Sequence, residues 1–236
     1  MQKQWIKTNE CQFLDKVYAM IDKKMLAQRE LTEAQKEIRR IDGSIFYLEP
    51  FSVQFITKEY VSWLRNNHVN RYLLKANHAI TFQEAKRFCG EMINSEHDMF
   101  FAIILKNGKK HIGNVRLGPI DFESKNIKLA IMIGDSRFHN LGIGTEIVKR
   151  CSDFCFYKLG MRKLFLEVID ENKAAIRIYE KNGFQTEGLL KNHFLCNGKP
   201  VNILIMSLFN EEPDMLLCEQ EEGFIYDPTP DESLCT

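Results

Sequence analysis

The sequence has no apolar run long enough to cross a membrane and no segment of the kind that directs secretion. One of its longest apolar stretches, residues 100–105, falls far short of the roughly 20 residues that a membrane-spanning helix needs. The first residues also lack the apolar core of a signal peptide. These absences lead us to expect a soluble, cytoplasmic protein with no membrane partner.

Patterns typical of metal sites and disulfide frameworks are lacking too. The seven cysteines show no C-x-x-C and no Cys/His ligand spacing, and an odd number cannot all pair within one chain. No cluster of basic residues alternates with aromatic residues, as it does on many nucleic-acid-binding surfaces. We therefore expect reduced thiols, no metal and no nucleic-acid partner.

Positive charge is missing from the C-terminal segment. The residues after Phe209 carry nine acids and no Lys or Arg. The rest of the chain therefore has 32 Lys and Arg against 23 Asp and Glu, a formal charge of +9. With its three prolines, the segment 210–236 is expected to be an acidic, irregular tail. A positive body would help to attract an anionic cofactor or substrate, although basic residues spread over a solvated surface give the same count.

The length of 236 residues suits one domain with extensions. From Asn9 to Ile41, apolar residues recur at three- and four-residue steps with one shift of phase, which predicts two helices or one bent helix. We interpret residues 1–43 as an N-terminal helical extension and residues 44–209 as the domain. An amphipathic extension could pack on its own core or on a neighbouring subunit, so a homodimer is one expectation.

Within the domain, helical and strand patterns alternate. We expect helices at 57–67, 81–94, 144–158 and 172–182, and strands at 45–48, 99–106, 111–117, 127–133, 163–168, 184–189 and 201–208. Thr81 and Glu84 have the spacing of a capping box at the start of the second helix. Short connections, such as the turn Asn107-Gly108, favour antiparallel pairing of the middle strands. The pattern predicts an α+β fold.

Gly142 and Gly144 lie between a predicted strand and a predicted helix. The free N–H groups and the dipole of a helix N-terminus can bind an anion, and glycine lets a phosphate approach the backbone closely. On its own, however, a G-x-G in this place is also what a simple tight turn shows. The loop is a candidate diphosphate site whose interpretation depends on the sequence that follows.

Beyond the next predicted strand, residues 170–184 read DENKAAIRIYEKNGF. Together with Gly142-x-Gly144, this resembles the GNAT acyltransferase superfamily. Its diphosphate loop reads roughly Arg/Gln-x-x-Gly-x-Gly/Ala, and its later helix carries Asn, Ala and Tyr-Glu-Lys-x-Gly-Phe. The resemblance covers about residues 45–209 and implies a mixed, mostly antiparallel central sheet flanked by helices. It also implies an N-acetyltransferase that uses acetyl-coenzyme A as co-substrate and requires no metal.

Carried over by position, the resemblance assigns the cofactor to three parts of the chain. The strand end at Met132 and Ile133 would offer backbone groups to the pantetheine and the thioester. Asn172 would face the pantetheine arm, and Tyr179 would lie near the sulfur, where a phenol can protonate the departing thiolate. A core tyrosine on a buried helix face would account for Tyr179 without chemistry. The diphosphate would be bound by the loop residues His139, Leu141, Gly142, Ile143, Gly144 and Thr145.

Two positions depart from the family pattern. His139 stands where relatives commonly have Arg or Gln, which leaves its side-chain role open but does not affect the backbone of the loop. Lys128 stands about where many relatives place a glutamate that deprotonates the amine, so the general base is unassigned. The acidic candidates near strand ends are Asp121, Glu123, Asp135 and Glu167.

The acceptor should be a primary amine. Residues 113–117, 133–135 and 197–199 look most like acetyltransferases of amino sugars carried on nucleotides. We therefore expect a sugar nucleotide as the small-molecule acceptor. Polar residues on strands usually alternate toward solvent, which is the plainer interpretation of those found here. The residues that could meet the acceptor are His68, Asn114 and Arg116.

Two alternatives stay open. The helix 57–67 and the strand with Glu187-Gly188 also resemble ribosomal-protein N-terminal acetyltransferases, which would make a protein N-terminus the acceptor. A non-catalytic acyl-coenzyme A-binding or assembly protein could keep the same fold. The presence of Asn172 and Tyr179 argues against this last alternative.

Overall fold

The computed structural model describes residues 40–66, 69, 71–72, 80–196 and 198–211. The chain divides into two compact units, Met1–Glu37 and Ile38–Thr236, and every described residue belongs to the second. The helices expected before residue 40 and the acidic tail from residue 212 lie outside the described residues. None of the described helices is long and apolar enough to cross a membrane.

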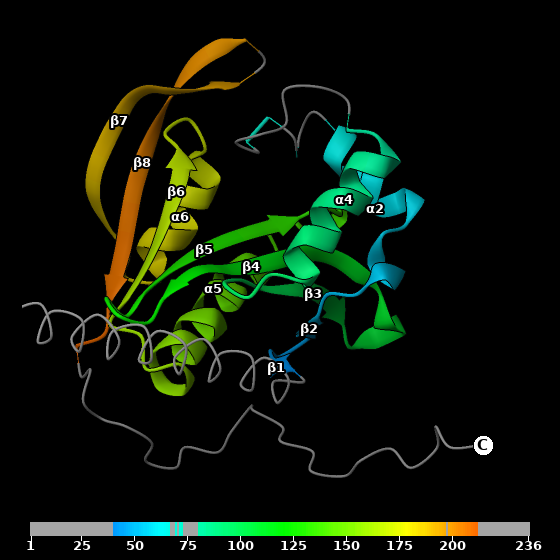
Figure 1. Cartoon of the computed structure of the whole chain (residues 1–236), viewed down its shortest axis with the longest axis horizontal. Helices are drawn as coiled ribbons and strands as arrows, with labels where there is room; N and C mark the ends of the chain where they lie inside the picture. The colour runs from blue at the N-terminus through cyan, green and yellow to red at the C-terminus, as the bar shows by residue number, and fades with distance from the viewer. Residues whose placement is uncertain (1–39, 67–68, 70, 73–79, 197, 212–236) are drawn as a thin grey trace, which may run out of the picture. The chain divides into compact units, whose positions relative to one another are not determined.

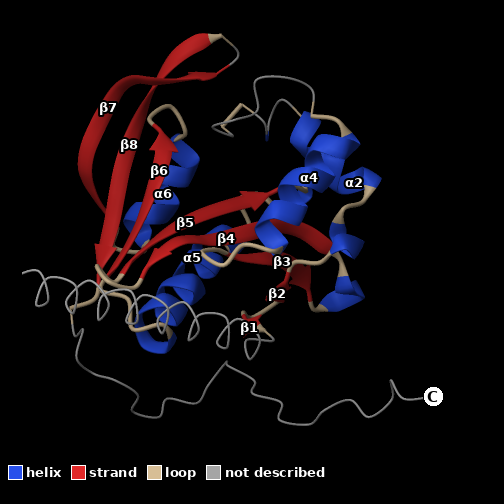
Figure 2. Ribbon diagram, in the orientation of Figure 1, coloured by secondary structure: helices blue, strands red, loops and turns tan. Residues whose placement is uncertain are grey.

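Eight strands form one sheet in the order β1-β2-β3-β4-β5-β6-β8-β7, seen in Figures 1 and 2. Neighbouring strands are antiparallel except for β5 and β6, which are parallel. The expected mixed, mostly antiparallel sheet is therefore confirmed. The strands are β1 Ile41–Asp42, β2 Phe46–Pro50, β3 Met99–Leu105, β4 His111–Asp121, β5 Asn126–Ile133, β6 Lys163–Ile169, β7 Gln185–Cys196 and β8 Lys199–Phe209.

The sheet splits between β5 and β6. Residues 126–128 of β5 pair with residues 163–165 of β6, but the remainder of β5 pairs only with β4. Likewise, the remainder of β6 pairs only with β8. Figure 1 shows the two strands diverging from their paired end. We call this divergence the split; it leaves one edge of β5 without a partner strand in the middle of the sheet.

Four helices with the expected positions flank the sheet. They are α2 Lys58–Arg65, α4 Phe82–Ile93, α5 Ile143–Asp153 and α6 Lys173–Lys181, with a π-helical turn Phe154–Lys158 after α5. The predicted capping box is present, because Thr81 accepts from the N–H of Glu84 while the Glu84 carboxylate accepts from the N–H of Thr81. Such reciprocal bonds satisfy two N–H groups that a helix start leaves free.

The helices cover opposite faces of the sheet. Helices α2 and α4 form a buried cluster with Ala102 of β3 and Met132 of β5. On the other face, Gly144 of α5 lies close to Ile133 of β5 and Ile178 of α6. Because successive strand residues point to opposite faces, Met132 faces α2 and α4, whereas Ile133 faces α5 and α6.

Two sequence-based expectations need correction. Ile41, which the periodicity placed in a helix, is paired with Leu48 in β1, so the described part of the predicted extension joins the sheet. The hairpin of β7 and β8 is longer than expected, since β7 continues to Cys196. Much of this hairpin is exposed, and it therefore lacks the alternation of buried apolar residues from which strands are recognised.

Candidate active site

The glycine loop presents free backbone N–H groups. Gly142 is the N-cap of α5 with a left-handed backbone, φ 79° and ψ −9°, and no side chain caps the helix. The bond from Glu146 N–H to Gly142 C=O measures 3.1 Å, so the three preceding N–H groups have no acceptor within the helix. A Cβ atom at Gly142 would meet no described atom within 4 Å, and Leu141 is 63% exposed. The loop is therefore open to an anion.

The remaining predicted loop residues expose little of their side chains. The side chain of Ile143 is buried, as is Gly144, and Thr145 is half-buried. Their N–H groups nevertheless belong to the open first turn of α5. Gly144 in this turn lies close to Ile133 at the end of β5. An anion bound at this turn would thus lie near the end of β5.

Alternate backbone groups of β5 face the split. The N–H of Gly134 donates to the C=O of Ile112 at 2.9 Å, so Gly113 and Ile133 form a non-hydrogen-bonded pair of the antiparallel ladder. The N–H and C=O of Ile133 therefore point away from β4 and toward the split, while those of Met132 are directed to β4. Of the two residues expected to offer backbone groups, Ile133 is the one positioned to do so.

His139 contacts the same strand end. Its Nε2 lies 2.8 Å from the C=O of Ile133, and this distance identifies a hydrogen bond in which the ring donates. The side chain thus binds the protein backbone, at the residue where relatives commonly have Arg or Gln. Because the C=O of Ile133 accepts this hydrogen bond, the Ile133 group left to face a ligand in the split is its N–H.

Asn172 and Tyr179 come from the start and the core face of α6. Asn172 is the N-cap, and its Oδ1 accepts from the N–H of Ala175 at 3.3 Å, which leaves its amide NH₂ for another partner. Tyr179 is only 7% exposed and packs against Phe184. Burial raises the pKa of Tyr179 to about 12, so the phenol is protonated at neutral pH. Its hydroxyl has no hydrogen-bond partner among the described residues.

The opposite face of the sheet is open beside the split. Ala130, although it lies on a central strand, is exposed on the face that carries α2 and α4. Arg116 is paired with Asp98 at 2.7 Å on this face, and Lys128 with Glu167 at 2.8 Å. Asn114 has a buried Oδ1 that no described residue contacts by a hydrogen bond. We call this surface the acceptor face, and it brings together the predicted residues Asn114 and Arg116.

The four acidic candidates lie in different places. Asp121 ends β4 beside Asn126, away from the unpaired end of β5, and Glu123 is in the adjoining exposed turn. Asp135 is buried, and hydrogen bonds from Arg137 and Lys110 hold its pKa well below the usual range. Glu167 alone among these four belongs to the acceptor face. His68 lies outside the described residues.

Sequence reasoning missed the contact between Trp63 and Gly134. The Trp63 ring of α2 lies directly against Gly134, where a Cβ atom would collide with it. The ring also packs against His111 with centroids 5.1 Å apart. Burial lowers the pKa of His111 to about 4, and its Nε2 hydrogen-bonds the C=O of Gly113. The only available signal was a glycine directly after a predicted strand.

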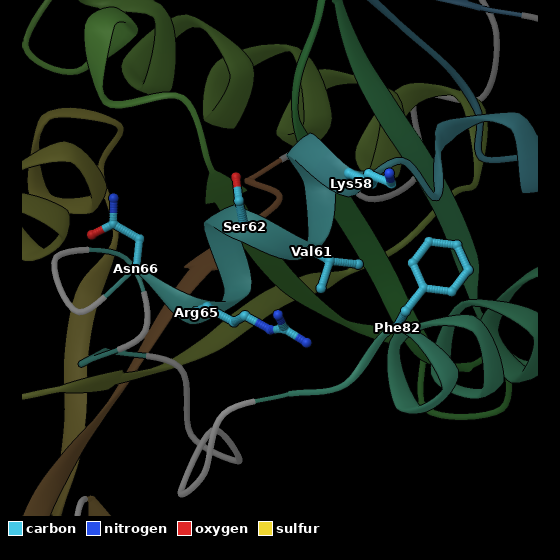
Figure 3. A pocket seen from close by; sticks show the side chains of 6 residues that line it. All are labelled: Lys58, Val61, Ser62, Arg65, Asn66 and Phe82. Atoms are coloured by element: carbon cyan, nitrogen blue, oxygen red, sulfur yellow. The ribbon is translucent and has the colours of Figure 1, made fainter.

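A pocket beside α2 contains none of the predicted residues. Figure 3 shows side chains from α2 and the start of α4 around it. By helical geometry its lining positions on α2 face away from Trp63. The lining residues are Lys58, Val61, Ser62, Arg65, Asn66 and Phe82. Within the described ranges, no three or more His, Cys, Asp or Glu residues are grouped as metal ligands.

Comparison with known proteins gives consistent results. A family model described as an acetyltransferase (GNAT) domain matches residues 47–185. The spermidine N(1)-acetyltransferase of Escherichia coli K12 is 31% identical over 154 residues, which cover 65% of this chain and 81% of that protein.

Solved structures resemble the fold. The spermidine N-acetyltransferase of Vibrio cholerae, in complex with CoA and spermine, superimposes with a TM-score of 0.65 at 22% identity and covers 72% of this chain and 99% of that one. The ribosomal-protein-S5-alanine acetyltransferase of Vibrio fischeri gives a TM-score of 0.63 at 19% identity, with coverage of 73% and 97%. At these identities the structural likeness shows the fold alone.

Proposed function

The chain belongs to the GNAT family of acetyltransferases, and from this we propose that it transfers the acetyl group of acetyl-coenzyme A to a primary amine by direct attack. The observation that carries the proposal is the open first turn of α5 beside the unpaired edge of β5. It provides an anion site and a strand edge within one region. A helix start can bind a diphosphate, and a free strand edge can bind the amides of an arm joined to that diphosphate.

The residues present suit acetyl-coenzyme A. The N–H groups of Ile143, Gly144 and Thr145 would bind the diphosphate, and glycine at 142 leaves the approach free of a Cβ atom. The free edge of β5 would bind the pantetheine amides as a neighbouring strand would. The NH₂ of Asn172 would add a donor from α6. Among the relatives, the V. cholerae enzyme is seen with CoA bound.

The proposed reaction needs two proton transfers. The amine nitrogen forms a bond to the thioester carbon, the carbon–sulfur bond breaks, and Ile133 N–H stabilises the charge that develops on the oxygen. Glu167 takes the proton lost by the amine, directly or through water, and Lys128 holds its carboxylate in place. Tyr179 gives its proton to the departing thiolate. Alignment of the reactants supplies the larger part of the acceleration, up to about 7 to 11 kcal/mol in well-oriented systems.

The relatives support different acceptors from the one that the sequence segments suggested. Those described above are named for spermidine or for a ribosomal protein, and none of them for an amino sugar on a nucleotide. The nucleotide-sugar acceptor therefore depends on the sequence segments alone, while a small-molecule amine is supported by the spermidine enzymes. A protein N-terminus stays the second candidate acceptor.

Thiol release tests the proposed function. The full-length protein is incubated with acetyl-coenzyme A and with spermidine, peptides or a nucleotide-linked amino sugar, and free thiol and the mass of each acceptor are measured. We expect one acceptor class to gain a single acetyl group with equal release of thiol. Binding of coenzyme A in a calorimeter without turnover on any amine would favour the non-catalytic alternative, and absence of both would overturn the proposal.

A further inference from the structure

Two long segments of the chain contain no acidic residue. None occurs between Glu59 and Glu84, and none between Glu187 and Glu211, although 32 of the 236 residues are Asp or Glu. The first segment includes residues 60–65 of α2 and leads to α4; the second contains β7 after Glu187 and the whole of β8. Their basic residues are Arg65, Arg71, Lys75, Lys191 and Lys199, together with His68, His78 and His193.

Described residues of these two segments meet at the tip of the hairpin. At the tip of the hairpin, the Cys196 thiol donates to the C=O of Arg71 at 3.1 Å, although the residues are 125 positions apart. Lys199 is the register partner of Cys196. In Figure 1 the hairpin and the helices α2 and α4 stand on either side of the diverging ends of β5 and β6. An acceptor that approached between them would pass near the hairpin tip.

The described residues around the hairpin tip include basic side chains without an ion-pair partner among the described residues. The side chains of Arg71, Lys191 and Lys199 are exposed, and none forms an ion pair with a described residue. Among the described acids, Glu167 is paired with Lys128 and Asp98 with Arg116. Asp170, which follows β6, accepts a hydrogen bond from Asn202 of β8. As far as the described residues go, basic side chains therefore predominate at the hairpin tip.

We infer that the acceptor is an anionic amine, which carries a phosphate or carboxylate group in the same molecule as the primary amine. A positive entrance attracts such a molecule and repels a polycation such as spermidine. The guanidinium of Arg71 offers a fork of donors that matches either anion, and Lys199 adds a point charge next to it. The inference rests on the proposed acetyl transfer and narrows its substrate class.

Charge reversal at the hairpin tip tests the inference. The variant Arg71→Glu/Lys199→Glu is compared with Lys86→Glu/Arg87→Glu, which makes the same change at two exposed residues of α4. The acceptors are a nucleotide-linked amino sugar, the same sugar without its nucleotide, an acidic peptide, and spermidine. Comparison of the nucleotide-linked sugar with the acidic peptide distinguishes a phosphate from a carboxylate as the source of the negative charge.

For the wild type, we expect kcat/KM to be at least about tenfold higher for an anionic acceptor than for the nucleotide-free sugar or spermidine. The hairpin variant should lose about tenfold on the anionic acceptor through KM, and the α4 variant should not. Added salt should also reduce the preference of the wild type for the anionic acceptor. The KM for acetyl-coenzyme A should stay unchanged in both variants.

Two results would overturn the inference while leaving acetyl transfer intact. One is a wild-type preference for spermidine or for the uncharged sugar, and the other is an anion preference that survives reversal of Arg71 and Lys199. Failure of the proposed function looks different, because then no acceptor of any charge would release thiol.

Discussion

The two sides of the split differ in the kind of group that they present to a ligand. The side that we propose for the cofactor offers main-chain groups, namely the free N–H groups at the start of α5 and the unpaired edge of β5. The acceptor face offers side chains, which come from strands, from α2 and from the tip of a distant hairpin. A main-chain site depends on glycine and on a helix start, so it leaves a short motif. A side-chain site assembled from distant segments leaves no such motif.

The largest expected effect concerns Tyr179, a side chain that we assign to the cofactor side. The variant Tyr179→Phe keeps the packing against Phe184 and removes only the hydroxyl. We expect kcat to fall by about 10²- to 10³-fold, because the phenol is the proposed acid. Affinity for acetyl-coenzyme A, measured by calorimetry, should change by no more than about threefold. Wild-type turnover in the variant would show that the tyrosine has a structural role only.

Stability should depend on pH through His111, which packs beneath α2. Burial lowers its pKa to about 4 from an ordinary value of 6.5. Between these two values the unfolded chain binds a proton that the folded chain does not, so the free energy of unfolding falls as pH falls. The loss should reach up to about 3 kcal/mol near pH 4 and be absent above pH 6.5.

Urea denaturation at a series of pH values measures this loss. The variant His111→Phe keeps an aromatic ring in the cluster and cannot titrate, so its stability should change less over the same window. Parallel pH profiles for the two proteins would show that His111 is not the titrating group.

The contact of α2 with the end of β5 can be tested at Gly134. Gly134→Ala places a methyl group against the Trp63 ring, which should lower the free energy of unfolding by about 2 kcal/mol through overpacking. The matched change is Gly90→Ala in α4, where a Cβ atom meets no described atom within 4 Å. This control should gain up to about 1 kcal/mol. Equal denaturation midpoints for the two variants would contradict the assigned contact.

A smaller effect is expected at Gly142. Gly142→Ala and Gly160→Ala both put a methyl group at a left-handed residue, φ 79° and φ 63°, where the described structure leaves open space. The backbone strain should therefore be similar in both. We expect only the change at 142 to weaken the binding of acetyl-coenzyme A, by about tenfold, because only there does the methyl group lie in the path of the diphosphate. Calorimetric titration of both variants measures the difference.

The sequence predicted most of the fold because local signals agreed with the tertiary structure. Thr81 and Glu84 marked the start of α4 correctly. Helices α2, α4 and α6 lie within their expected ranges, and α5 begins one residue early, at Ile143. Ile41 was misread since its apolar neighbours continue a helical period, whereas its strand is defined only by pairing with Leu48. The length of β7 was missed because its outer half is exposed.

The candidate site was predictable to the extent that its parts are local. The sequence placed Gly142 before a helix and Asn172 at the start of one, and in the structure each is the N-cap of its helix. The bond from His139 to Ile133 and the contact of Trp63 with Gly134 depend on how separate elements pack. No spacing in the sequence reveals such contacts. The proposed general base illustrates the same limit, since only the pairing of β5 with β6 places Glu167 beside Lys128.

The central claim is that main-chain N–H groups at the start of α5 bind the diphosphate of acetyl-coenzyme A. A crystal structure of the protein with coenzyme A tests it most directly. We expect diphosphate oxygens within about 3 Å of the N–H groups of Ile143, Gly144 or Thr145, with the thiol beside the Tyr179 hydroxyl. A coenzyme A molecule whose diphosphate lies away from this turn, with the split empty, would contradict the claim.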